Sequence, residues 1–420
     1  LDIVGKSTPR IDGPLKTTGS APYAYERHDV ADNQLVGYPI FASISHGTIV
    51  SMDFEPARAS SGYMGHVSTL DMDVLPKSNW NVAQLFGGNK VQHYHQAIGI
   101  VVAKSFEEAR AAAHSVKVEY AADKVVSDLK MAINALPESA VEVRSKVGDF
   151  ETAFASSDVT IDQTYTTPGQ SHAMMEPHAS IAQWNGDKLT LWTSNQMIHW
   201  NVEALAESLS MPAENIRVDS PYIGGGFGSK LFLRADAVLA ALAARKTKRA
   251  VKIMLPRPYI ANNTTHRAAT IQQIKIGASR DGQITAIYHS GASGNLPDGG
   301  SEDCTAQTRH FYAGANRLIV RQLAEVFLPE GNAMRAPGET SGLMALEIAM
   351  DEMAERLEMD PVAFRIKNDT QIDPHDSEKP FSERHFVECL QTGAERFGWA
   401  QRNTVPGGQR EGNWLIGHGI

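Results

Sequence analysis

The sequence predicts a protein of mixed α+β and α/β class with two or three domains. A chain of 420 residues with 42% hydrophobic side chains is long enough to form more than one core. Two segments indicate α/β structure: a strand, helix and strand between residues 98 and 121, and a strand, glycine-rich loop and helix between residues 216 and 244. The polar stretch at residues 123–137 predicts a domain boundary between them.

Composition and charge exclude several classes of protein. The net charge of −9 and the isoelectric point near 5.9 disfavour a nucleic-acid surface, which needs clustered lysine and arginine. No apolar run approaches the roughly 20 residues that span a bilayer. The two cysteines, Cys304 and Cys389, are too few for a disulfide framework, a four-cysteine zinc site or an iron–sulfur cluster. We therefore expect any such centre on a partner.

The N-terminal part of the chain combines short strands with one helix. Residues 34–53 hold β-prone runs, and residues 98–103 form a continuous apolar strand candidate. Ser105 predicts the start of a helix, because Glu108 three residues later completes a capping box. Residues 116–120 alternate like a strand, which together predicts one βαβ unit.

Two histidines precede this unit and suggest a metal site. His93 and His95 stand two positions apart, but no third ligand is visible near them. We therefore expect exposed or hydrogen-bonded histidines here.

The second half alternates strands with loops and ends in a long helix. Asp149 is an N-cap candidate, and residues 291–300, which contain four glycines, predict a long loop. Residues 341–357 predict a core-facing amphipathic helix. Further strands are expected at residues 159–165, 188–193, 251–255, 272–276 and 284–288.

The most distinctive stretch is Gly224–Lys230, which we call the glycine loop. Its four glycines allow positive φ angles and a close approach of the backbone to a ligand. A predicted strand precedes it and a predicted helix follows, an arrangement that can present free N–H groups to an anion. Ser229 breaks both the Walker and the dinucleotide-binding templates. The residues alone leave an anion site and a merely flexible turn equally open.

Three other segments carry residues with possible chemistry. Residues 171–178 place a glutamate between two histidines, but Pro177 prevents one shared helical face, so a buried polar turn is favoured. The amides in residues 193–196 can donate to a ligand or cap a helix, and capping is the simpler interpretation. Arg335 lies before a Pro-Gly turn at a helix entrance, which suits an anion but also an ordinary surface arginine.

Six ordered motifs give the chain a resemblance to a known family. It resembles the molybdenum-binding large subunits of the xanthine dehydrogenase and aldehyde oxidase family, in particular the bacterial periplasmic aldehyde oxidoreductases. The resemblance runs almost end to end, and a set of six motifs is far more specific than the glycine loop alone. The motifs are Arg-Ile-Asp-Gly-Pro-Leu-Lys-Thr-Thr-Gly at 10–19, His-Tyr-His-Gln-Ala at 93–97, Met-Glu-Pro-His-Ala at 175–179, Trp-Thr-Ser-Asn-Gln at 192–196, the glycine loop, and Met-Arg-Ala-Pro-Gly-Glu at 334–339.

The resemblance implies an α/β hammerhead domain followed by a molybdopterin-binding domain. On this basis we expect a succession of five segments. They are an extended lead-in at 1–18, the hammerhead domain at 19–125, a linker at 126–147, the first cofactor-binding domain at 148–400, and the start of a second at 401–420.

The same resemblance implies which residues bind the cofactor. By motif position, Gln196 approaches the ligands of the molybdenum, and Gly226, Phe227 and Gly228 offer backbone amides to an oxo group or the pterin. Arg335 is expected in the wall of the active site. No residue of the chain is expected to ligate the molybdenum directly, because the pterin dithiolene holds it.

The implied function is oxidation of aromatic and aliphatic aldehydes to carboxylic acids. The implied cofactor is molybdopterin cytosine dinucleotide, with electrons leaving through [2Fe-2S] clusters and FAD on partner subunits. The two cysteines agree with a separate iron–sulfur subunit and a separate FAD-binding subunit, as in a heterotrimer.

The catalytic glutamate of the family is expected beyond Ile420, in a remaining C-terminal part of the large subunit. Neither Glu176 nor Glu339 is therefore assigned as the base, and the chain itself is expected to hold no catalytic residue. Leu231 stands where purine-oxidising relatives place a glutamate, which favours aldehydes over purines. Ser229 replaces a usual glycine but is small enough for the loop to form.

Two alternatives remain: an N-heterocycle hydroxylase of the same family, and a non-catalytic cofactor-binding or assembly protein. The chain begins with Leu1 and shows no basic-then-apolar leader, so we expect missing upstream residues. A periplasmic location is expected from the resemblance, with folded export through a partner's signal, and the cytoplasm is the second choice.

Overall fold

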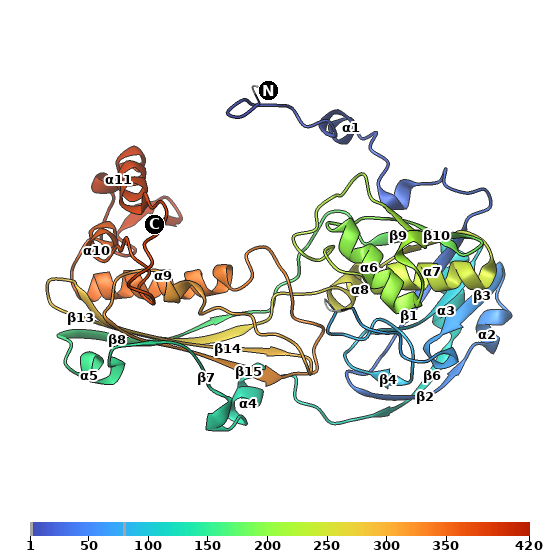
Figure 1. The fold of residues 1–420 in the computed structure, drawn as a ribbon, viewed down its shortest axis with the longest axis horizontal. Coiled ribbons are helices and arrows are strands. Elements are labelled where there is room, and N and C mark those ends of the chain that lie inside the picture. Colours follow the sequence, from blue (N-terminus) through green and yellow to red (C-terminus); the bar gives the residue numbers. More distant parts are fainter. Residues whose placement is uncertain (1–2, 79–80) are drawn as a thin grey trace.

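The computed structural model describes residues 3–78 and 81–420, which fold into two lobes along one long axis (Figure 1). One lobe contains a seven-stranded and a three-stranded sheet, and the other contains a five-stranded sheet. A two-stranded hairpin lies near the C-terminus. This arrangement confirms the predicted mixture of α/β and α+β architecture.

The seven-stranded sheet joins distant parts of the sequence, because its strand order is β11-β10-β9-β12-β1-β5-β3. The pairs β1–β12 and β10–β11 are parallel, and the other pairs are antiparallel. The expected hammerhead and cofactor-binding ranges therefore contribute strands to one sheet. Its strands are β1 Leu35–Phe41, β3 Tyr63–Ser68, β5 Ala97–Ala103, β9 Ala179–Asn185, β10 Lys188–Thr193, β11 Ile216–Asp219 and β12 Val251–Met254.

Helix α7, Ala235–Thr247, lies across this sheet and is buried at every position from Ala235 to Ala244. A helix that is apolar on all sides needs packing partners on all sides. Its neighbours include β9, β12 and β3, and α6, Ile198–Leu209, adds residues to the same core. The glycine loop lies in the connection between β11 and α7.

The smaller sheet of this lobe has the order β4-β2-β6, with β2 Gly47–Asp53, β4 Lys90–Val91 and β6 Lys117–Ala122. Helix α3, Phe106–Ser115, begins with the predicted Ser105–Glu108 capping box. The predicted βαβ unit is nevertheless wrong, because β5 belongs to the large sheet and β6 pairs antiparallel with β2. Most residues of β6 are exposed or partly exposed, which an antiparallel pair tolerates and a buried parallel crossover does not.

The second lobe has a sheet of order β7-β15-β14-β13-β8 covered by α9, Glu339–Arg356 (Figure 1). The predicted apolar stripe of α9 faces this sheet, and Leu346, Met350 and Met353 are fully buried. The strands are β7 Glu142–Val147, β8 Val159–Thr167, β13 Thr270–Ala278, β14 Ile284–Asn295 and β15 Asn316–Glu325.

The described residues contain further α-helices and one more pair of strands. The other helices are α1 Gly13–Thr17, α2 Glu55–Arg58, α4 Leu129–Asn134, α5 Phe150–Ala155, α8 Arg257–Asn263, α10 Pro361–Lys367 and α11 Phe386–Phe397, and the terminal hairpin is β16 Gln409–Glu411 with β17 Trp414–Ile416.

Three further expectations can be compared with these elements. The long loop expected at 291–300 is wrong in its first half, because β14 continues to Asn295. A Cβ at Gly291 would lie 2.5 Å from Cys304 Sγ, so this glycine permits close packing within a strand instead of a turn. Residues 126–147, expected as a linker, contain α4 and the whole of β7, and the lead-in contains α1, which has no buried residue. The domain boundaries themselves stay a prediction.

Both histidines of the pair are hydrogen-bonded, as expected. His93 is buried, and its Nδ1 lies 3.0 Å from the Tyr94 carbonyl oxygen. Within residues 3–78 and 81–420, no group of three potential metal-ligating side chains occurs. Over the same residues, no helix is long and apolar enough to cross a membrane.

Candidate cofactor site

The glycine loop lies between β11, which ends at Asp219, and α7, which begins at Ala235. The φ angles of Gly225, Phe227 and Gly228 are all positive, at 94°, 54° and 110°. Glycine adopts such angles without steric cost, whereas Phe227 does so only where the surrounding structure holds it. Within the loop, Ser229 N donates to Gly226 O at 2.9 Å.

Three glycines of the loop are required by close packing. A Cβ at Gly224 would lie 2.5 Å from Glu176 Cβ, and one at Gly226 would lie 2.3 Å from Gln196 Oε1. A Cβ at Gly228 would lie 2.3 Å from the carbonyl oxygen of Ala333. The loop is therefore the meeting point of three segments, those around residues 176, 196 and 333.

Gln196 follows β10 and is bound to the glycine loop on two sides. Its backbone N donates to Lys230 O at 2.8 Å, and its side-chain Oε1 accepts from the amides of Gly228 at 2.9 Å and Lys230 at 3.3 Å. Because the amide oxygen is occupied, the Nε2 group is the part of this exposed side chain left to donate to a ligand.

Arg335 lies beside the same loop, although it is far away in the sequence. Its backbone N donates to Phe227 O at 2.8 Å, while its own carbonyl accepts from Arg267 Nη2 at 2.6 Å. Arg267 is buried and paired with Glu302 at 2.8 Å. This pair fixes the backbone of the 334–336 segment and leaves the side chain of Arg335 exposed.

The structure thus brings together all five residues assigned to the cofactor from the sequence. It also reveals residues that were not assigned: Lys230 at the end of the loop, Glu176 beneath it, and the Arg267–Glu302 pair. Glu176 was visible in its Met-Glu-Pro-His motif, but Arg267 and Glu302 stand in segments with no distinctive pattern. Their partners lie far away in the sequence, so no local signal identifies them.

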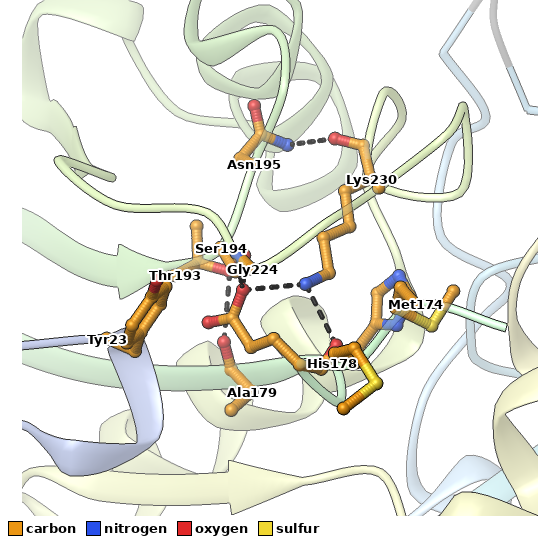
Figure 2. Close-up of polar contacts among 12 residues, drawn as sticks. Tyr23, Met174, His178, Ala179, Thr193, Ser194, Asn195, Gly224 and Lys230 are labelled. Carbon is orange, nitrogen blue, oxygen red and sulfur yellow. Dashed lines mark hydrogen bonds and ion pairs between the residues drawn. The ribbon is translucent and has the colours of Figure 1, made fainter. Parts of the chain in front are cut away.

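Two buried basic side chains, those of His178 and Lys230, lie close together at the loop (Figure 2). Burial lowers the pKa of His178 to about 3, with the nearby charge of Lys230 as the second cause. Burial is also the main reason why the pKa of Lys230 lies below its usual value, an effect that Glu176 opposes. A neutral His178 donates from Nε2 to Ser229 O at 3.2 Å and so supports the loop from below.

The donor set suits a cofactor that brings its own metal ligands. Within the described residues, the backbone amides of Gly225, Gly226 and Phe227 donate to no protein acceptor. Unpaired amides are rare in a folded protein, and consecutive free amides form an anion-binding concavity. With Gln196 Nε2 and the exposed guanidinium of Arg335 they offer only donors, as oxo and phosphate oxygens require. The residues therefore fit a molybdopterin better than a directly ligated metal ion.

Comparison with known proteins agrees with this geometry. Residues 133–369 match the family described as molybdopterin cofactor-binding domain, and residues 18–124 match the aldehyde oxidase and xanthine dehydrogenase a/b hammerhead domain. Since the first match covers more than half of the chain, the protein belongs to this molybdopterin cofactor-binding family. The predicted resemblance to the xanthine dehydrogenase and aldehyde oxidase family is thereby confirmed.

The chain is also similar to individual molybdenum-binding and molybdopterin subunits. The aldehyde oxidoreductase molybdenum-binding subunit PaoC of Escherichia coli strain K12 is 55% identical over 423 residues, which cover 100% of this chain and 58% of that subunit. The nicotinate dehydrogenase large molybdopterin subunit of Eubacterium barkeri is 26% identical over 397 residues, covering 88% of this chain and 90% of that subunit. The present chain therefore spans little more than half the length of the Escherichia coli subunit.

Among solved structures, the aldehyde oxidoreductase from Desulfovibrio gigas has the same fold. Its TM-score is 0.84 at 23% sequence identity, and the match covers 94% of this chain and 47% of that one. The hammerhead and molybdopterin-binding folds expected from the sequence are thus confirmed.

Proposed function

We propose that this chain is the cofactor-binding part of a molybdenum-dependent enzyme that oxidises aldehydes to carboxylic acids. One observation carries the proposal: free hydrogen-bond donors converge at the glycine loop of a chain that is 55% identical, over its whole length, to an aldehyde oxidoreductase molybdenum-binding subunit. The nicotinate dehydrogenase subunit, which supports the alternative of an N-heterocycle substrate, is only 26% identical.

The residues of this chain would bind and orient the cofactor. A bound molybdopterin would supply the two-electron redox chemistry that the protein side chains lack. Gln196 Nε2 and the amides of Gly225–Phe227 would donate to its oxygen atoms, and the guanidinium of Arg335 would stabilise negative charge at the site wall. Phe227, with 44% of its surface exposed, would offer an apolar face beside these donors.

The finer assignment is also a proposal. We infer that the cofactor is the cytosine dinucleotide form and that the base glutamate lies in a segment beyond Ile420. We further propose a periplasmic heterotrimer with an iron–sulfur subunit and an FAD-binding subunit, exported in the folded state. The two cysteines support the separate iron–sulfur subunit, because they cannot hold a cluster within this chain.

The test is chemical analysis of the native complex together with an activity assay. We expect molybdenum and a cytidine nucleotide in equal amounts, and oxidation of benzaldehyde with an artificial electron acceptor. Faster turnover of isoquinoline would favour the N-heterocycle alternative, and cofactor without any turnover would favour the non-catalytic one. Absence of both molybdenum and cytidine nucleotide would refute the proposal.

A pair of variants localises the site. Gln196→Ala removes the free donor and should lower molybdenum content. Gln371→Ala removes an exposed glutamine whose Nε2 donates to Asp369, far from the glycine loop in the sequence, and it should leave that content unchanged. Equal loss in both variants would show that the glycine loop is not the cofactor site.

A further inference from the structure

The glycine loop is supported from beneath by a buried ion pair. Lys230 Nζ lies 2.8 Å from Glu176 Oε2, and the two side chains are 0% and 11% exposed (Figure 2). The same ammonium group donates to the backbone carbonyl of Glu176 at 3.0 Å. Burying two charges is costly, and an apolar pair of similar size is often at least as stable. Stability alone therefore does not explain this pair.

The carboxylate of Glu176 joins three segments through one oxygen atom. Oε2 accepts from Lys230 Nζ, from Ser194 Oγ at 2.6 Å and from the backbone amide of Gly224 at 2.7 Å. The backbone adds a second bond, since Glu176 N donates to Gly224 O at 3.1 Å. One carboxylate oxygen thus fixes both ends of the glycine loop and the segment that follows β10.

Lys230 extends the same network to Gln196. The carbonyl oxygen of Lys230 accepts from Gln196 N at 2.8 Å and from Asn195 Nδ2 at 3.0 Å, and Lys230 N donates to Gln196 Oε1. The position of Gln196 therefore depends on the position of Lys230, which in turn depends on Glu176. Hydrogen bonds to charged groups are directional and roughly twice as strong as neutral ones, so they restrict such a network more tightly.

We propose that Glu176 and Lys230 are positioning residues, whose ion pair holds the free amides of the glycine loop and the donor group of Gln196 in the geometry that receives the cofactor. The proposal deepens the proposed function and rests on it. Neither residue needs to touch the cofactor. Their effect is to reduce the number of conformations of a loop whose glycines would otherwise be free to change φ and ψ.

Amide hydrogen exchange in the native complex, prepared in cofactor-free form, tests this proposal without relying on activity. Glu176→Gln and Lys230→Met each leave one buried charge without its partner and should lower stability. The double variant removes both charges, so it should recover stability. If the pair positions the loop, its hydrogen-bonded amides will still exchange at least about tenfold faster than in the wild type, and molybdenum content after cofactor supply will stay below the wild-type value. These amides are those of Gly224, Gly228, Ser229 and Lys230.

Two further variants keep the test decisive if the charge variants fold poorly. Ser194→Ala removes one neutral donor to Glu176 and should accelerate exchange of the loop by about 2- to 13-fold without unfolding. Lys252→Met is the matched control. Like Lys230, Lys252 is a buried lysine, but it lies in β12 and its ammonium group donates to Tyr25 O. It should lower stability and leave exchange of the loop unchanged.

Wild-type exchange of the hydrogen-bonded amides of the glycine loop, in the double variant or in Ser194→Ala, would overturn the proposal. If Lys252→Met accelerated exchange of the loop equally, the effect of the ion pair would be general stabilisation of the fold, and this result would also overturn the proposal. These outcomes do not depend on whether the wild type binds molybdenum, so failure of the proposed function remains a separate result.

Discussion

The contact between Gly226 and Gln196 gives a sharp prediction for a small substitution. In Gly226→Ala the new Cβ would lie 2.3 Å from Oε1, 2.7 Å from Cδ and 3.0 Å from Cγ of Gln196. Such distances are too short, and the end of an exposed glutamine moves more easily than the backbone. We expect the carboxamide of Gln196 to rotate away from the loop.

The magnitude follows from the bonds that this rotation breaks. Gln196 Oε1 accepts from the amides of Gly228 and Lys230, both of which are buried. Leaving a buried donor unpaired costs about 1–3 kcal/mol, which corresponds to about 5- to 150-fold faster amide exchange. The effect should be confined to the glycine loop, since the core under α7 is not touched.

The assay is hydrogen exchange measured on peptides that cover residues 224–230, in a double-mutant cycle. Gln196→Ala removes the same acceptor, so adding Gly226→Ala to it should change exchange very little. Coupling between the two substitutions should therefore be about as large as either single effect. Gly300→Ala is the control, because a Cβ there would meet no atom of the described residues within 4 Å. Additive effects in the double variant would refute the reasoning.

Other predictions concern stability. Gly228→Val should unfold the loop and not merely exclude a ligand, because φ is 110° and the new Cβ would lie too close to the backbone carbonyl of Ala333. An unchanged melting temperature would contradict this prediction. Burial lowers the pKa of three histidines below 6.5, so the unfolded chain binds more protons than the native one at pH about 4 to 6.5. These histidines are His93, His178 and His289. The free energy of unfolding should fall as pH drops through this window, by up to about 4 kcal/mol per pH unit for the three together. His289→Gln should make the dependence of this free energy on pH shallower. Burial lowers the pKa of Lys252 to about 8. Between pH about 8 and 10.5 the unfolded chain therefore binds more protons at this lysine than the native protein does, and the free energy of unfolding should rise with pH. The free energy of unfolding of the wild type minus that of Lys252→Met should increase over the same range.

Much of the secondary structure could be predicted because its causes are local. The Ser105–Glu108 capping box, the Asp149 N-cap and the apolar stripe of α9 involve residues within a few positions of one another. Errors arose where pairing decided the outcome. The alternation of residues in β6 was visible, but its partner β2 was not, and Gly291 was interpreted as a loop residue although it packs against Cys304.

The sequence by itself determined the family of this protein and the five residues expected at its cofactor, because six motifs occur in order along the chain. Only the tertiary structure decided how those residues are held. The bonds from Glu176 to Lys230 and from Arg335 to Phe227 join positions far apart in the chain, and no local pattern specifies such pairs. Strand pairing and the packing of α7 bring them together. The glycine loop is therefore a recognisable motif in the sequence, and it becomes a supported set of donors only in the folded protein.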